Sequence, residues 1–212
     1  MKIETWVDVA CPWCYVGKKR LEDAIASSGH ADDIELVLHT FELDPGAPVE
    51  PMSNPEYIAQ AMGVSASKVI GFEAPLRALA AAEGLDFTSQ RVVSRSVDAL
   101  RLMHLAAEYG AAREFFATVQ AALFAGRTDV YTHEVLIDAA ERAGVPRERA
   151  AAVITGTEYA SAVAADRAAA VALGAQGAPF TMIDGRYGVP GVVATDAYRD
   201  AISRAFREKA SA

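Results

Sequence analysis

A strand, a Cys-Pro-Trp-Cys tetrapeptide and a helix follow one another at the start of this chain, and that order constrains its fold more than any other feature. Residues 3–9 have the period of two that is typical of a strand, and residues 12–27 carry apolar side chains at helical spacing. Cys11 is therefore predicted to lie at the exposed N-terminal end of the helix, and Pro12 at an early position that needs no backbone donor. Free backbone N–H groups and the positive end of the helix dipole favour a thiolate at such a place.

The tetrapeptide holds both cysteines of the chain. Cys14 lies one turn further into the helix, where it is more shielded than Cys11 but near enough to form a disulfide with it. In a reducing compartment, a single pair of this spacing is typical of catalysis rather than of a structural disulfide. We therefore interpret Cys11 as a catalytic attacking thiol and Cys14 as its catalytic resolving partner.

A second apolar run covers residues 34–41 and has the composition of a strand buried on both faces. Together with the first strand and helix it forms a strand–helix–strand unit whose spacing is typical of parallel pairing. From about residue 54 to 174 the pattern is helical almost throughout, with Asn54 as a candidate N-cap and Pro75 expected to divide one helix. The aromatic pair Phe115–Phe116 is expected to pack in a core.

Strand signals return only near the end of the chain. Residues 180–183 and 186–189 flank Asp184-Gly185, a strong signal for a two-residue hairpin, and a closing helix is expected to begin at Thr195. This order predicts an α/β fold in which a large all-helical insertion separates the second and third strands. We expect residues 1–50 and 175–212 to form the sheet domain and residues 51–174 the helical insertion.

Composition narrows the function classes. The chain has 212 residues, of which 52% are hydrophobic, so it can bury a substantial core. Its formal net charge of −8 argues against nucleic acid or an anionic membrane surface as a partner. No stretch approaches the roughly 18 uncharged apolar residues of a membrane span, and the sequence runs from Met1 into a strand without an apolar leader. We therefore expect a cytoplasmic protein; a monomer and a homodimer are both open.

Several segments spread over nearly the whole chain carry a family signature. They are DVACPWCYVGK at residues 8–18, FELDP at 41–45, HEVL at 133–136, and GAPF at 177–180 running to DGRYGV at 184–189. In this order they resemble the DsbA family of thioredoxin-fold oxidoreductases and, within it, the FrnE-like branch. The resemblance implies a thioredoxin fold with a helical insertion, and thiol–disulfide exchange at Cys11 and Cys14.

The same resemblance assigns residues around the thiols. It implies that Pro179 follows a cis peptide bond and faces the cysteine pair, and that the backbone of Ala178 is presented to an incoming peptide or thiol. Pro12 and Trp13 tune the reduction potential in this superfamily, and we expect them to contact substrate along with Ala178 and Pro179. For Trp13 the alternative is that it simply covers the helix end. Relatives often carry asparagine where Ser96 stands, so no catalytic role is assigned to its helix.

Two carboxylates are candidate proton acceptors for Cys14. Asp8 and Glu42 both follow predicted strands near the start of the helix, where a carboxylate would ease deprotonation of the resolving thiol. The alternatives are that Asp8 caps the helix and that Glu42 forms an ordinary loop ion pair. His104 and His133 lie on predicted helices and are expected to be core or surface histidines rather than catalysts.

The leading hypothesis is a thiol–disulfide oxidoreductase, with disulfide isomerase activity as a variant, that acts on a protein or small-molecule disulfide. No cofactor or metal is expected beyond the redox-active disulfide, and glutathione is the candidate recycling thiol. A zinc half-site would need four ligands, and the chain has no second Cys-X-X-Cys or His-X₃₋₅-His motif. The remaining alternatives are a glutathione-dependent isomerase or transferase similar to the hydroxychromene-carboxylate isomerases, and a thiol-based client-binding (chaperone) module.

Overall fold

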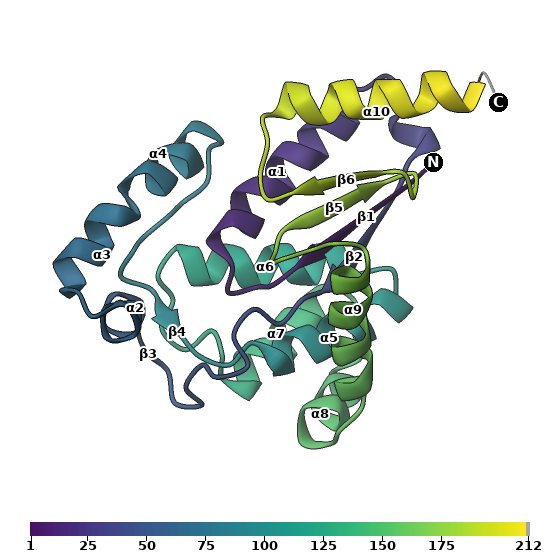
Figure 1. Cartoon of the computed structure of the whole chain (residues 1–212). Coiled ribbons are helices and arrows are strands. Elements are labelled where there is room, and N and C mark those ends of the chain that lie inside the picture. Colours follow the sequence, from purple (N-terminus) through teal and green to yellow (C-terminus); the bar gives the residue numbers. More distant parts are fainter. Residues whose placement is uncertain (211–212) are drawn as a thin grey trace.

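A four-stranded sheet lies at the centre of the computed structural model, which describes residues 1–210 (Figure 1). The strands, in the spatial order β2-β1-β5-β6, are β2 (Glu35–Thr40), β1 (Lys2–Val7), β5 (Phe180–Ile183) and β6 (Tyr187–Pro190). β1 pairs in parallel with β2 and antiparallel with β5, and β5 pairs antiparallel with β6. The parallel pair is joined by α1 (Pro12–Ala26), and the β5–β6 hairpin turns at Asp184 and Gly185, both at positive φ.

The second strand is less buried than its composition predicts. β2 is an edge strand, so only β1 pairs with it, and only Leu38 and Thr40 among its residues are buried. The prediction of a strand buried on both faces was therefore wrong. An apolar run cannot by itself distinguish a central strand from an edge strand that helices cover in part.

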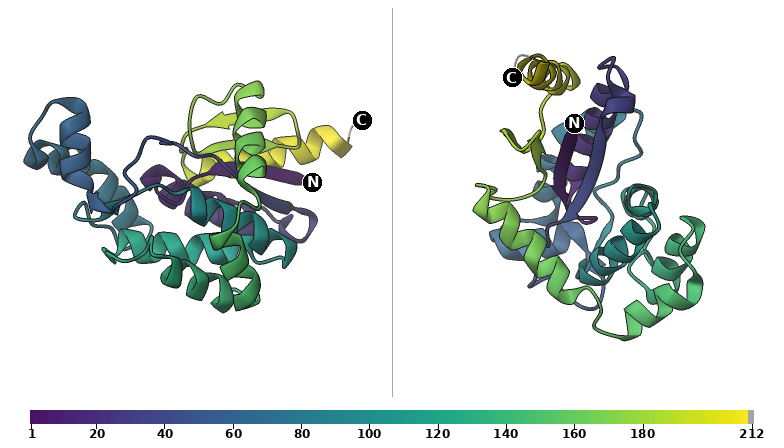
Figure 2. Two further views of the ribbon diagram at one scale, coloured as in Figure 1. Left: turned by 90° about the horizontal axis from the view of Figure 1, so that it is seen from below. Right: turned by 90° about the vertical axis from the view of Figure 1, so that its right-hand side faces the viewer.

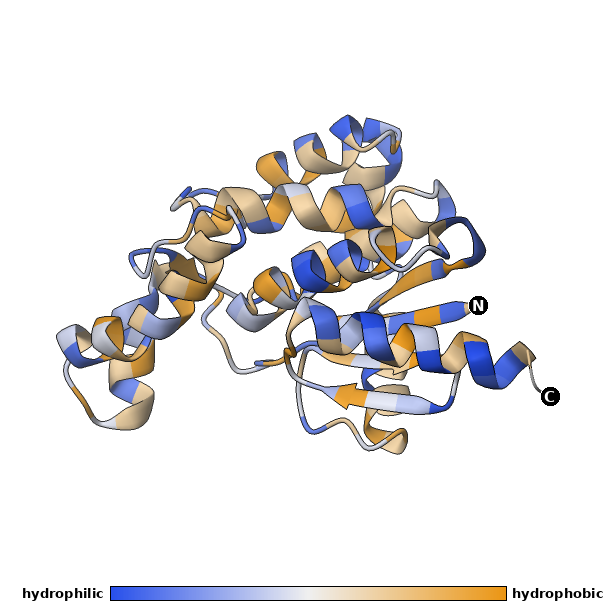
Figure 3. Cartoon of the chain, turned by 90° about the horizontal axis from the view of Figure 1, so that it is seen from above, coloured by the Kyte–Doolittle hydropathy of each residue, from blue (hydrophilic) through white to orange (hydrophobic). Residues whose placement is uncertain are grey.

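One face of the sheet packs against α1 and the closing helix α10 (Thr195–Ala210), as the upper layer of Figure 1 shows. Their shared core is formed by buried apolar side chains from strands and helices: Ile3, Leu21, Ala24, Ile183, Tyr198, Ile202 and Ala205. In Figure 3 the helix that leads to the C-terminus alternates between hydrophobic and hydrophilic bands, which fits a helix with one buried side.

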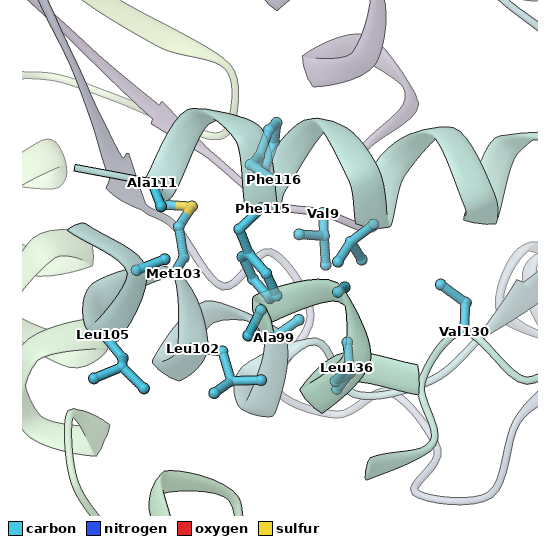
Figure 4. Close-up of a cluster of buried hydrophobic side chains, with 14 of the residues drawn as sticks. Val9, Ala99, Leu102, Met103, Leu105, Ala111, Phe115, Phe116, Val130 and Leu136 are labelled. Carbon is cyan, nitrogen blue, oxygen red and sulfur yellow. The ribbon is translucent and has the colours of Figure 1, made fainter. Parts of the chain in front are cut away.

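The other face of the sheet is covered by the helical insertion, which lies between β2 and β5. Its helices are α2 (Asn54–Met62), α3 (Ala66–Phe72), α4 (Ala74–Ala82), α5 (Val97–Glu108), α6 (Ala112–Phe124), α7 (His133–Arg142), α8 (Arg147–Thr155) and α9 (Ala160–Ala172). Figure 4 shows the core between α5, α6 and α7, in which Phe115 and Phe116 are buried beside Val9 of the cysteine segment. The expectation that both phenylalanines pack in a core is confirmed.

Helices α2, α3 and α4 form a lobe that projects to one side of the molecule (Figure 2). Pro75 lies in the first turn of α4, where it separates α4 from α3 as predicted. The lobe contacts α1, where Val16 packs with Leu76 and Arg20 forms an ion pair of 2.6 Å with Glu83. It also contacts the segment that follows it, through the ion pair of 2.8 Å between Glu73 and Arg91.

The topology confirms a thioredoxin fold with a helical insertion between the second and third strands. The division into domains at residues 50 and 175 remains a prediction. Three short elements were not foreseen: a 3-10 turn at Ala31–Asp33 and the paired strands β3 (Met52–Ser53) and β4 (Val92–Val93). Asn54 is the first residue of α2, whereas Ser53 is its N-cap. None of the helices in residues 1–210 is long and apolar enough to cross a membrane.

Candidate active site

Cys11 is the N-cap residue of α1. Its backbone is extended, and its Sγ accepts a hydrogen bond of 3.3 Å from the backbone N–H of Cys14. A negative charge on this sulfur would therefore be stabilised by an amide donor and by the helix dipole. Cys11 is only 2% exposed. The prediction of an exposed helix end was thus wrong, because the sequence could not show that the insertion and the loop at Pro179 cover it.

Cys14 lies one turn into α1 and is fully buried. Both cysteines are free thiols in this structure. Burial, together with the hydrogen bond and charge of Cys11, raises the pKa of the Cys14 thiol well above its usual range. The second thiol therefore needs help from another group to lose its proton, whereas the first accepts a hydrogen bond from the N–H of Cys14.

The loop before β5 closes over the thiols. The Ala178–Pro179 peptide bond is cis, as the resemblance implied, and the carbonyl oxygen of Ala178 accepts a hydrogen bond of 3.4 Å from Cys11 Sγ. Gly17 on α1 permits this approach. A Cβ atom there would lie 2.9 Å from Val192 Cγ2 and 3.3 Å from Pro179 Cγ, so any side chain would push the loop away from the helix.

Asp8 follows β1 and is completely buried beside the thiols. Its carboxylate accepts hydrogen bonds from the N–H groups of Ala10 (3.0 Å) and Leu43 (2.8 Å) and from the hydroxyl of Ser96 (3.0 Å). Burial raises the pKa of Asp8 to about 6, although these hydrogen bonds lower it. The charge of Asp8 in turn raises the pKa of Cys14. Asp8 does not cap the helix, because Cys11 occupies that position.

Glu42 is placed less favourably than Asp8. It is half-buried, and its Oε1 is buried without a hydrogen-bond partner. Within the described chain it forms no ion pair, so the expected loop ion pair is absent. Its negative charge adds to the raised pKa of Asp8. Glu42 therefore acts on the electrostatics of Asp8, while Asp8 is the carboxylate whose charge acts on Cys14.

Gln120 is a site residue that the sequence did not reveal. It is buried on α6, and its side-chain amide donates to the carbonyl oxygens of Asp8 (3.3 Å), Val9 (3.4 Å) and Cys11 (3.3 Å). The insertion thereby holds the backbone of the cysteine segment through three hydrogen bonds. No local pattern could have found this residue, because more than a hundred positions separate it from the thiols.

An apolar groove of about 460 Å³ adjoins the tetrapeptide. Pro12 and Trp13 form one wall, and residues of the α2–α4 lobe form the other: Ile58, Met62, Val69, Phe72, Glu73, Pro75 and Leu76. The Trp13 side chain is 45% exposed, so it presents an aromatic surface rather than only covering the helix end.

A second polar cluster lies away from the thiols, where α5 and α9 meet β2. Asp166 on α9 contacts His39 Nδ1 (3.3 Å), His104 Nε2 (3.3 Å) and the N–H of Thr40 (2.8 Å). His104 is thus a partly buried structural residue that contacts Asp166, as expected. His133 is an exposed surface residue that pairs with Asp98, also as expected. Among residues 1–210, no three His, Cys, Asp or Glu side chains are placed to hold a metal ion.

Comparisons with known proteins agree with this geometry. The family model described as "DSBA-like thioredoxin domain" matches residues 2–203. Curated proteins gave no match to the chain.

Among solved structures, a probable DsbA oxidoreductase from Streptomyces coelicolor is 37% identical, with a TM-score of 0.91 over 98% of this chain and 91% of that one. A 2-hydroxychromene-2-carboxylate isomerase is 15% identical, with a TM-score of 0.69 over 100% of this chain and 98% of that one. A cytosolic disulfide reductase, DsbM from Pseudomonas aeruginosa, was solved with glutathione. It is 19% identical, with a TM-score of 0.63 over 98% of this chain and 100% of that one. The last two likenesses concern the fold alone.

Proposed function

Since the chain belongs to the DSBA-like thioredoxin domain family, we propose that it is a thiol–disulfide oxidoreductase whose redox pair is Cys11 and Cys14. The observation that carries this proposal is the arrangement of the two sulfurs. Cys11 Sγ is the N-cap acceptor of α1, with the Cys14 N–H at 3.3 Å and the carbonyl oxygen before cis-Pro179 at 3.4 Å. An attacking thiolate is stabilised by a donor such as the Cys14 N–H, and a resolving thiol needs to lie one turn behind it.

The reaction proceeds in two exchanges. The Cys11 thiolate attacks one sulfur of a substrate disulfide, forms a mixed disulfide and expels the other substrate sulfur as a thiolate. The Cys14 sulfur then attacks Cys11 Sγ, forms the Cys11–Cys14 disulfide and expels the second substrate thiolate. The substrate gains two electrons and the protein dithiol loses two. The same steps in reverse oxidise a substrate dithiol.

Asp8 is the proton acceptor for Cys14 in this proposal. The raised pKa of Cys14 disfavours its thiolate, and the carboxylate of Asp8 lies buried close enough for its charge to act on that thiol. With a pKa of about 6, Asp8 is mostly ionised at neutral pH and can take the proton as Cys14 attacks.

Substrate contacts follow from the surroundings of Cys11. The carbonyl oxygen of Ala178 lies 3.4 Å from Cys11 Sγ, and a cis peptide bond joins Ala178 to Pro179, so both residues would border a bound disulfide. Pro12 and Trp13 line the apolar groove on the other side. We therefore propose that these four residues bind substrate, and that the groove receives the apolar chain next to a protein disulfide.

A catalytic dithiol is typical of a reducing compartment, so we propose that the protein acts in the cytoplasm. We propose a monomer or homodimer, and glutathione or another low-molecular-weight thiol as the reductant that recycles the disulfide. The DsbM structure contains glutathione, which supports that choice of recycling thiol. A glutathione-dependent isomerase of the hydroxychromene-carboxylate type is the rival function. The two thiols of this chain favour redox exchange over it.

The decisive experiment traps the intermediate. In Cys14→Ser the first exchange still occurs but the second cannot. Incubation with disulfide-bonded insulin or a small disulfide should therefore accumulate a covalent adduct at Cys11. Mass spectrometry detects this adduct, and dithiothreitol should release it. Cys11→Ser is the matched control and should form no adduct and show no disulfide reductase activity.

The other functions predict different results. Wild-type reductase rates in Cys11→Ser would exclude the redox mechanism. Absence of any adduct in Cys14→Ser would indicate a binding module that holds clients without turnover. Glutathione-dependent isomerisation that persists when both cysteines are replaced would favour the isomerase.

A further inference from the structure

One side chain of the helical insertion, that of Ser96, donates a hydrogen bond to the carboxylate of the proposed proton acceptor, Asp8. Ser96 is the residue immediately before α5, and its hydroxyl donates to Asp8 Oδ2 at 3.0 Å. The other two donors to this carboxylate are backbone N–H groups, at Ala10 and Leu43. Ser96 and Asp8 are both buried, so water does not replace a lost donor readily.

We propose that Ser96 is a positioning residue of the redox site, whose hydroxyl keeps the Asp8 carboxylate ionised and oriented toward its role as proton acceptor for Cys14. This inference rests on the proposed thiol–disulfide function. It gives the insertion a part in the chemistry, whereas the sequence alone assigned no catalytic role to the helix that Ser96 precedes. Ser96 itself touches neither sulfur nor substrate and acts only through Asp8.

The physical reason lies in the balance between burial and hydrogen bonding. Burial disfavours the charged carboxylate, and each hydrogen bond to it favours that form. The pKa of Asp8, about 6, is the result of that balance and of the charge of Glu42, which raises it further; the charge of Asp8 acts in turn on the buried Cys14 thiol and Tyr131 hydroxyl. Loss of a hydrogen bond to a charged group should raise this pKa by about one unit. At neutral pH the acceptor would then change from mostly ionised to about half protonated.

Because of Gln120, a change in the protonation of Asp8 can be distinguished from a displacement of the backbone around the thiols. It holds the carbonyl oxygens of Asp8, Val9 and Cys11 independently of Ser96. The backbone of the cysteine segment should therefore stay in place when the Ser96 hydroxyl is removed. What changes is the protonation of one carboxylate, which is a pH-dependent effect.

A single-turnover reaction of the reduced protein with a chromogenic aromatic disulfide measures the step concerned. One aromatic thiolate is released when Cys11 forms the mixed disulfide, and a second when Cys14 displaces it, so the second phase reports the attack of Cys14. In Ser96→Ala, the acidic limb of the second-phase pH profile should move up by about one pH unit. The second phase should be about five-fold slower near pH 6 and equal to wild type near pH 8.5. The first phase should be unchanged.

Ser94→Ala is the matched control. Ser94 is a buried serine two residues away whose hydroxyl donates to the carbonyl oxygens of Pro48 (3.1 Å) and Val49 (2.8 Å) rather than to Asp8. Its removal should leave the pH profile unchanged. Ser96→Thr retains the hydroxyl and should restore the wild-type profile, and Ser96→Gly provides a second loss of the same donor.

The outcomes separate this inference from the function it rests on. The role of Ser96 would be overturned if the pH profile of the second phase were the same in Ser96→Ala and Ser94→Ala. It would also be overturned if Ser96→Ala slowed the second phase by the same factor at every pH. Either result would leave the proposed oxidoreductase function intact. A wild-type protein that never releases the second thiolate would instead overturn the proposed function itself.

Discussion

At the scale of single residues, the site contains a carboxylate that costs stability. Asp8 has a folded-state pKa of about 6 against an ordinary value of 3.8, so the folded protein binds its proton more tightly than the unfolded chain does. Above about pH 6 its charged form is buried at a cost, and below about pH 4 both states are protonated and the cost vanishes. Such a residue is expected where function rather than stability determines the side chain.

Replacing Asp8 should therefore make the protein more stable and should slow the attack of Cys14 on the mixed disulfide. We expect Asp8→Asn to raise the free energy of unfolding near pH 7 by up to about 3 kcal/mol, the equivalent of the pKa shift, with a gain that shrinks toward zero near pH 4. The second phase of single turnover should slow at least about ten-fold, because the acceptor for the Cys14 proton is lost. Urea unfolding at both pH values and stopped-flow absorbance measure the two effects. A variant that is less stable at neutral pH and still resolves mixed disulfides at the wild-type rate would contradict both roles of Asp8.

The sequence predicted part of this site because part of it is local. The pair Cys11 and Cys14 and their place at a helix start follow from the spacing within one segment. Ser96 and Gln120 could not be found in that way, since only the packing of α5 and α6 against the thiol segment brings them there. The same packing explains why Cys11 is buried although a helix start is exposed in isolation.

At the scale of elements, the junction between α9 and β2 depends on Asp166. Burial opposes ionisation, but hydrogen bonds with His104 and His39 hold the pKa of Asp166 well below its usual range. Burial likewise opposes the charge of His39, whereas Asp166 and Glu4 raise its pKa. Because its pKa is lowered, Asp166 contributes stability above about pH 4 and loses it as pH falls through its folded-state pKa. Because its pKa is raised, His39 contributes stability below about pH 6.5 and loses it as pH rises through its folded-state pKa. The junction is therefore strongest between those two values.

Asp166→Asn should weaken this junction in a pH-dependent way. Near pH 6 we expect the free energy of unfolding to fall by about 1–3 kcal/mol, and near pH 8.5 by less, because His39 loses its charge as pH rises through its raised pKa. Urea unfolding at the two pH values gives the difference. Asp196→Asn breaks the exposed pair with Arg199 and should change stability little at either pH. An equal loss at both pH values would show that the histidines do not contribute through charge.

The periodicity of the sequence predicted most elements but not their neighbours. The β5–β6 hairpin, the division of α3 from α4 at Pro75 and the closing helix follow from local turn and helix signals. The edge position of β2 and the pairing of β3 with β4 depend on which segments meet in space. A run such as residues 34–41 carries no such information.

At the scale of the whole molecule, the redox pair faces a groove that neither part of the chain forms alone. Pro12 and Trp13 come from α1, and the opposite wall comes from the α2–α4 lobe that projects beside it (Figure 2). The lining is almost wholly apolar, and its one acidic residue, Glu73, is paired with Arg91 at 2.8 Å. Glutathione carries several charges that need polar partners, so the groove suits an apolar polypeptide segment better than glutathione.

Truncation of the lobe wall should therefore separate the two kinds of substrate. Phe72 is 53% exposed on α3 in the groove, and Phe72→Ala should raise the KM for an unfolded polypeptide disulfide about ten-fold through lost apolar contact, with little change for glutathione disulfide. Val171→Ala on α9, a similar truncation of a half-exposed apolar side chain outside the groove, should alter neither KM. Steady-state kinetics on both substrates measures this. An equal rise in KM for both substrates, or no rise for either, would mean that the lobe does not determine substrate preference and that the residues at the thiols alone do.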